Sequence, residues 1–142
     1  MQKGDWVGLI SVGVILMGIG LFLWFAPRVD QLVYAPVEIT GSALTGQVTP
    51  EENAVTVTAE IKQPGFVVLH EALGEAPGPI AGQTPLLAPG SYTNFLLVPT
   101  MPMGPQDYFL LLFVDDGDGV YEPMVDLPVM TAGQVLKYKL SL

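Results

Sequence analysis

AVTVTAEI, residues 54–61, alternates between apolar and polar side chains from Val55 onward. Successive side chains of a β-strand point to opposite faces, so this alternation predicts a strand with one buried face. The apolar positions, which should face a core, are Val55, Val57, Ala59 and Ile61.

Further short β-segments follow this strand, separated by turn residues such as Gly and Pro. They are Gly65–Glu71, a piece near Pro79–Thr84, Tyr92–Val98, Tyr108–Val114, Val120–Val125 and Val135–Leu142. Together they predict an all-β fold, an Ig-like antiparallel β-sandwich of about seven strands.

Two of these segments carry more detailed expectations. Phe109–Val114 reads FLLLFV and is apolar at every residue, which predicts a central strand of a sheet. In the last segment alternation points Leu136, Tyr138, Leu140 and Leu142 inward. Lys137 and Lys139 should then face outward and protect a sheet edge from unwanted pairing.

Twenty uncharged residues, 7–26, precede the β-segments. As a helix they would span about 30 Å, the thickness of a hydrocarbon core, so they predict one N-terminal transmembrane helix. Trp6 and Trp24 would lie near opposite interfaces. A cleaved signal peptide is the alternative, but its apolar region would be about 7–15 residues long and would end in small residues.

These segments divide the chain into four parts. We expect a short cytoplasmic tail at 1–6, the transmembrane helix at 7–26, a juxtamembrane connector at 27–53 and the sandwich at 54–142. Lys3 and the amino group slightly favour an N-terminus inside the cell. The expected location is therefore the cytoplasmic membrane, single-pass, with the C-terminal domain extracytoplasmic.

Small residues line two faces of the expected helix. Gly8, Ser11 and Gly18 share one stripe, and Gly13 and Gly20 lie on the opposite side. Small residues let a neighbouring helix approach closely, so the expected partners are transmembrane helices of other subunits, besides membrane lipid. The alternative is that glycine is simply frequent in membrane helices.

Composition excludes several classes of partner and site. The formal net charge is −9, which repels nucleic-acid phosphates and could attract a basic soluble protein. No nucleic-acid partner is expected. The chain has no cysteine, so disulfides, thiol nucleophiles and Cys-ligated metals are ruled out.

The loop VDDGDGVYEPMVD, residues 114–126, is the strongest chemical signal. Asp115, Asp116 and Asp118, with Glu122, supply hard oxygens of the kind that calcium prefers, and Asp126 could also complete such a site. The loop does not fit an EF-hand, because the bidentate glutamate of that motif is missing. The alternative is a hairpin turn with solvated acidic side chains.

His70 is the only histidine and most simply a structural one. Thioethers suit Cu(I), so Met101, Met103 and Met124 could in principle join it in a soft copper site. No catalytic motif is present: no serine triad spacing, no phosphate-binding glycine loop and no HExxH. We therefore expect no enzyme activity and no cofactor other than calcium.

Three motifs also carry a resemblance. They are GFVVLH at 65–70, LAPGSYTN at 87–94 and DGDGVY at 116–121. With them, residues 55–142 resemble a poorly characterised family of surface-exposed β-sandwich domains of archaea and bacteria. The resemblance implies the fold and a surface location and no established activity.

Three functions remain compatible with these features. The first is a structural accessory subunit of a multisubunit membrane complex, such as a respiratory or photosynthetic one. The second is a free-standing, membrane-anchored binding or adhesion module stabilised by calcium. The third is a pilin-like filament subunit, which Asp5 and Leu9 disfavour because such proteins carry a glutamate where Leu9 stands.

Overall fold

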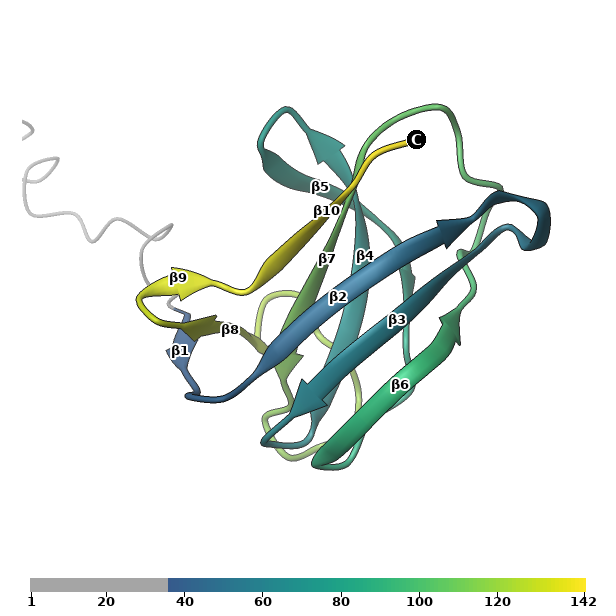
Figure 1. The fold of residues 1–142 in the computed structure, drawn as a ribbon. Coiled ribbons are helices and arrows are strands. Elements are labelled where there is room, and N and C mark those ends of the chain that lie inside the picture. The colour runs from purple at the N-terminus through teal and green to yellow at the C-terminus, as the bar shows by residue number, and fades with distance from the viewer. Residues whose placement is uncertain (1–35) are drawn as a thin grey trace, which may run out of the picture. The chain divides into compact units, whose positions relative to one another are not determined.

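The apolar runs form β-strands, and the computed structural model describes them in residues 36–142 (Figure 1). A 3₁₀ turn at Pro50–Glu52 joins the second and third strands. The strands are β1 (Val37–Glu38), β2 (Ala43–Thr49), β3 (Ala54–Ile61), β4 (Gly65–Leu73), β5 (Ala76–Gln83), β6 (Gly90–Leu97), β7 (Tyr108–Val114), β8 (Leu127–Thr131), β9 (Gln134–Val135) and β10 (Lys137–Leu140).

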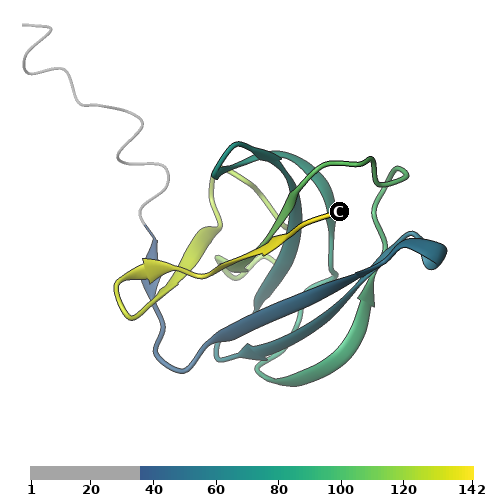
Figure 2. The same ribbon diagram turned by 45° about the horizontal axis from the view of Figure 1, so that its top comes forward.

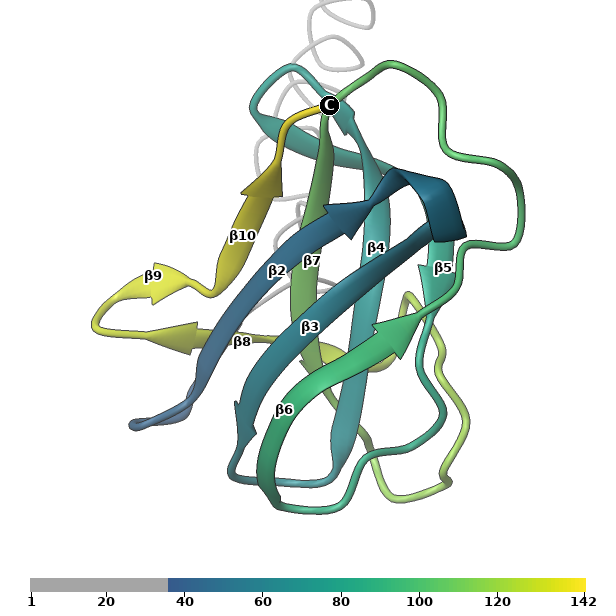
Figure 3. The ribbon, with the colours of Figure 1, turned by 45° about the vertical axis from the view of Figure 1, so that its right-hand side comes forward.

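The strands form two sheets. The small sheet has the order β2-β3-β6, and the large sheet has the order β1-β8-β7-β4-β5, with β10 paired to β7 and β9 to β8. Figure 3 shows β2, β3 and β6 as one layer in front of β4 and β7, and in Figure 2 the same layer runs along the lower side. All pairs are antiparallel except β1 with β8. The prediction of an all-β, two-sheet sandwich is confirmed.

The main core lies between the two sheets. From β3, the predicted inward residues Val55, Val57, Ala59 and Ile61 are all buried. They belong to one apolar cluster with Val67 and Leu69 of β4 and Leu110 and Leu112 of β7. Period-two alternation on β3 therefore correctly identified the face that packs.

The outer face of the large sheet is apolar as well. A second cluster contains Phe66, Val68, Phe109, Leu111, Phe113 and Tyr121, the last of which comes from the loop after β7. Strands covered on both faces need apolar residues at every position. This explains FLLLFV, and β7 is central as predicted, since it pairs with β4, β8 and β10.

One glycine is required by close packing of these strands. A Cβ on Gly65 would collide with the backbone carbonyl oxygen of Phe113, which precedes its β7 partner Val114. Any larger residue would have to push the two strands apart. The close pairing of β4 with β7 therefore requires glycine at position 65.

The expected connector at 27–53 is wrong over its last part. Residues 43–49 form β2, which pairs along its whole length with β3, and Leu44 is buried in the core. A Cβ on Gly46 would collide with Leu110, so the glycine lets β2 lie close to the core. β2 was missed because Thr, Gly and Gln at its other positions hide the alternation.

The chain enters the sandwich through β1, which pairs in parallel with β8. The Glu38 carboxylate accepts hydrogen bonds from the backbone N–H groups of Ala132 (2.9 Å) and Gly133 (3.3 Å), in the turn between β8 and β9. The Ile39 N–H donates to the Met130 carbonyl at 2.9 Å. Residues before the expected sandwich boundary are thus fastened to the large sheet.

Two predicted strands near the C-terminus need correction. Residues 120–125 are not a strand but turns, and the next strand begins at Leu127. Residues 135–142 divide into β9 and β10. On β10 Leu140 is buried and both lysines are exposed, as expected, whereas Tyr138 is exposed, contrary to the prediction. Leu142, which follows β10, is exposed as well, and β10 pairs only with β7.

Among residues 36–142 there is no helix with the length and hydropathy to cross a bilayer. The expected helix at 7–26, with Gly8, Ser11, Gly13, Gly18 and Gly20, lies outside the described residues, as does the expected tail at 1–6.

Candidate functional site

The acidic loop between β7 and β8 gathers three of the predicted metal ligands. Carboxylate oxygens of Asp115, Asp116 and Asp118 lie within 4.8 Å of one another. Glu122, the fourth predicted ligand, is exposed and is not a member of this group. The structure therefore brings together three carboxylates out of the four.

Backbone N–H groups of the same loop occupy part of these carboxylates. The Gly119 N–H donates to both oxygens of Asp115 at 3.1 Å, and the Val120 N–H donates to Asp118 at 2.9 Å. The Asp118 N–H donates to Asp116 at 3.3 Å. Such Asx-type turns hold the loop, and they leave further lone pairs on each carboxylate.

Asp126 has a role that the sequence did not reveal. Its side chain is only 1% exposed and accepts hydrogen bonds from the N–H groups of Asp116 (3.2 Å) and Glu122 (2.8 Å). The Asp126 carboxylate therefore links the parts of the loop at Asp116 and Glu122 to each other. A sequence signal existed, since a lone aspartate just before an apolar strand is a usual position for a turn-stabilising side chain.

The carboxylates repel one another. The charge of Asp118 is the main reason that the pKa of Glu122 is raised, with desolvation, Asp116 and Asp126 adding to it. The Asp118 N–H lowers the pKa of Asp116, but desolvation and the Asp118 and Asp126 carboxylates outweigh it, so that pKa is raised too. A hard divalent cation such as calcium fits this oxygen set, with water and carbonyls completing its shell.

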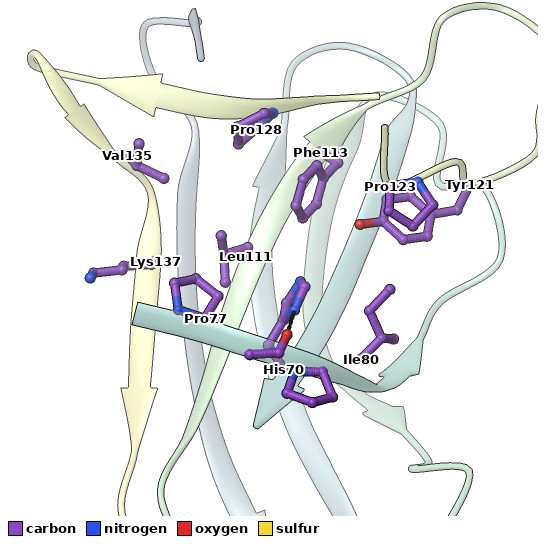
Figure 4. Close-up of a pocket in the computed structure, with 12 residues that line it drawn as sticks. His70, Pro77, Ile80, Leu111, Phe113, Tyr121, Pro123, Pro128, Val135 and Lys137 are labelled. Atoms are coloured by element: carbon purple, nitrogen blue, oxygen red, sulfur yellow. Dashed lines mark hydrogen bonds between the residues drawn. The ribbon is translucent and has the colours of Figure 1, made fainter. Parts of the chain in front are cut away.

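His70 lies on β4, on the outer face of the large sheet, and is 9% exposed. Its Nδ1 lies 2.8 Å from the carbonyl oxygen of Gly78 on β5, the bond drawn dashed in Figure 4. Its Nε2 is buried and has no hydrogen-bond partner among the described residues. Burial lowers the pKa of His70, and the hydrogen bond to Gly78 opposes this only in part.

A recess of about 660 Å³ opens beside His70. Its walls are mostly apolar and come from β5, β7, the acidic loop, β8, β9 and β10 (Figure 4). The lining includes four prolines, Pro77, Pro79, Pro123 and Pro128. Sequence reasoning missed this recess, because its wall residues are spread over some 60 positions of the chain and share no motif.

One of the three methionines considered as copper ligands lies away from His70. Met103 packs against the core between the sheets, whereas His70 lies on the opposite face of the large sheet. Met101 and Met124 are exposed. Met103 therefore cannot share a soft copper site with His70, because the large sheet separates it from the imidazole.

The family of the chain follows from its sequence over the sandwich. The family DUF7282, described as a domain of unknown function, matches residues 42–140, from just before β2 to the end of β10. No curated protein and no solved structure matches the chain. Because the match covers well over half of the sequence, the protein belongs to the DUF7282 family.

Proposed function

We propose that this protein is a non-catalytic accessory subunit of a multisubunit membrane complex, such as a respiratory or photosynthetic electron-transport complex. In this proposal residues 7–26 span the cytoplasmic membrane with the N-terminus inside, and the sandwich lies on the extracytoplasmic face. The small residues of the helix would pack against transmembrane helices of other subunits.

The observation that carries the proposal is the open edge of the small sheet. β6 is the last strand of that sheet and pairs only with β3. No lysine or proline protects it. At its end, Leu96, Val98 and Met101 are 56%, 64% and 75% exposed.

An edge strand without lysine or proline is a site for pairing with another chain, and β6 is interrupted only by the bulge in its pairing with β3. Natural sheets usually blunt such edges, as the lysines of β10 do at the margin of the large sheet. An accessory subunit whose β6 is covered by a partner subunit would need no such protection. The β6 edge is therefore the expected contact with the complex.

Charge supports a second type of partner. Residues 36–142 contain three lysines and twelve acidic residues, a formal net charge of −9. A domain with this charge would attract a basic soluble protein over a distance of about 10 Å at moderate salt. Such a negative charge would suit a subunit of a complex that exchanges electrons with a basic soluble carrier.

We also propose that the sandwich is Ig-like in its connectivity. The small sheet, β2-β3-β6, corresponds to strands A, B and E of that fold, and β5-β4-β7-β10 corresponds to C′, C, F and G. An Ig-like domain is a common scaffold for binding rather than for catalysis, although the fold alone fixes no function.

A free-standing calcium-stabilised binding module is the second candidate. The cluster of Asp115, Asp116 and Asp118 favours it. Such a module would behave as a monomer after gentle extraction, whereas a subunit would migrate with its partners.

The test is the solubilisation of native membranes in a mild detergent, capture through a C-terminal tag and identification of what is retained. Accessory function predicts a defined set of membrane proteins in constant ratio to the bait. Recovery of the chain alone at native abundance would overturn the proposal.

Substitutions then locate the contact. Leu96→Lys should lower the amount of partner protein retained with the tagged chain at least tenfold, because it places a charge at an exposed apolar position of β6. Leu73→Lys is the matched control, because Leu73 is 65% exposed at the end of β4, in the other sheet. Equal retention by both variants would exclude the β6 edge as the interface.

A further inference from the structure

The imidazole of His70 is held in one protonation state by its surroundings. Nδ1 faces a carbonyl oxygen, which can only accept, so Nδ1 carries the proton and donates it to Gly78. Burial favours the neutral ring. Nε2 is then a bare acceptor, and it has no partner in the described part of the chain.

An unpaired acceptor in an apolar site is costly. Leaving a buried polar group without its hydrogen bond costs about 1–3 kcal/mol. A histidine that served only to hold Gly78 would need just one of its nitrogens, and an amide or hydroxyl could do the same. The second nitrogen is explained if something else donates to it.

The recess next to the ring has the size and chemistry of a small-molecule site. Its volume of about 660 Å³ lies within the range of roughly 300–1,000 Å³ that is usual for ligand pockets. Four of its wall residues are prolines, which offer carbonyl groups but no N–H donors. The wall is therefore mostly apolar and rigid at these positions, and its donor side chains besides His70 are Tyr121 and Lys137, of which Lys137 already donates to the Glu75 carbonyl.

We propose that this recess binds a small apolar molecule bearing a hydroxyl group, a phenol or an alcohol, whose O–H donates to Nε2 of His70. The apolar body of the ligand lies against Leu111, Phe113 and Ile80. A peptide segment fits less well, because its several carbonyl groups would meet only two donor side chains in the wall besides His70, namely Tyr121 and Lys137. The proposal is independent of the accessory role described above.

Nε2 has less than 1 Å² of exposed surface. The hydroxyl therefore reaches it only when the wall beside it moves outward. Tyr121 and Pro123 of the acidic loop belong to that wall, and the loop joins the sheet through the packing of Tyr121 on Phe66 and Phe113. Occupancy should thus widen the recess on the side of this loop.

The chain offers a direct probe, because His70 is its only histidine. Full-length protein in lipid nanodiscs, labelled with ¹⁵N only in histidine, gives one pair of ring-nitrogen signals. Titration with phenol should shift the signal of the unprotonated nitrogen, saturably, toward its hydrogen-bonded position. Toluene has the same shape but lacks the hydroxyl, and should bind at least about tenfold more weakly, the value of one hydrogen bond.

Two variants separate specific binding from partition into lipid. Val135→Trp places a large side chain on the recess wall and should abolish the phenol shift. Val98→Trp is the matched control, since Val98 is exposed and does not line the recess, and it should leave the shift unchanged. His70→Phe, followed by saturation-transfer NMR of the ligands, should remove the preference for phenol over toluene.

The proposal has clear contrary outcomes. It is wrong if phenol leaves the nitrogen signal in place, if toluene binds as well as phenol, or if Val135→Trp keeps the response. It is equally wrong if the signal already reports a hydrogen bond before phenol is added, because water or a protein segment then holds the position.

Discussion

Leu110 and Leu111 are neighbours on β7, and they face opposite sides of the large sheet. Leu110 packs between the sheets, in the cluster with Val57 and Leu112. Leu111 packs outside, in the cluster with Phe113, and lines the recess. Both are buried, but the first is covered by a regular sheet and the second by a loop and prolines.

The difference teaches what a continuous apolar strand requires. A strand such as β7 needs a cover on each face, since either face alone would leave several large side chains in water. The inner cover, β3, is a regular strand with matched alternation, and it seals the core. The outer cover is irregular, so it leaves a space, and His70, whose Nε2 is buried and unpaired among the described residues, lines that space.

The largest expected loss of stability comes from a substitution on the inner face of β7, which packs between the two sheets. Leu110→Ala should lower the free energy of unfolding by about 2–5 kcal/mol, because it creates a closed cavity. Leu111→Ala should cost about half as much, since it enlarges a recess that is already open. Urea unfolding of the full chain, followed by circular dichroism, measures both. Equal costs would mean that the outer face is as tightly sealed as the inner one.

The next effect concerns the cover of the outer face. Asp126→Ala should cost about 1–3 kcal/mol, because the N–H groups of Asp116 and Glu122 lose their acceptor. Hydrogen exchange at these two amides should accelerate while exchange in β3 changes less. Glu122→Ala, at an exposed position, is the control. Unchanged exchange at both amides would show that Asp126 does not anchor the loop.

A smaller effect depends on pH. Because the pKa of His70 is lowered in the fold, the unfolded chain binds a proton that the folded chain rejects once the pH falls below about 6.5. Stability is therefore full above that pH and declines below it, by up to about 1.4 kcal/mol per pH unit. His70→Gln should decline less steeply between pH 6.5 and 5.5. Parallel curves for both proteins would contradict a neutral buried imidazole.

The smallest effect concerns the acidic loop. Repulsion raises the pKa values of Asp116 and Glu122, so ionising them weakens the folded state, and stability should rise as the pH falls through the raised values. Calcium should relieve the same repulsion and raise the melting temperature at neutral pH. Asp118→Asn should reduce this gain. Identical melting temperatures in chelator and in millimolar calcium would argue against a stabilising site.

The sequence predicted those parts of the fold whose pattern is local. Alternation on β3 and the unbroken apolar run of β7 each reflect the faces of a single strand, so both were recognised. β2 was not predicted, because its packing depends on a contact between Gly46 and Leu110, which lie on strands far apart in the chain. Residues 120–125 were wrongly predicted to form a strand, because their two valines lie in a bend and a turn.

The candidate sites divide in the same way. Asp115, Asp116 and Asp118 are adjacent in sequence, and the loop brings them together as the spacing suggested. The recess is built from prolines and apolar residues of six segments, and only the pairing of β4, β5 and β7 assembles it. Long-range pairing of this kind leaves no local pattern to recognise.

The manner in which the chain enters the sandwich has a mechanical consequence. β1 runs parallel to β8, and the Glu38 carboxylate accepts hydrogen bonds from the turn that follows β8. A force that reaches the domain through residue 36 acts on these bonds together rather than one after another. Tension on the N-terminal side is thus passed into the large sheet through β8.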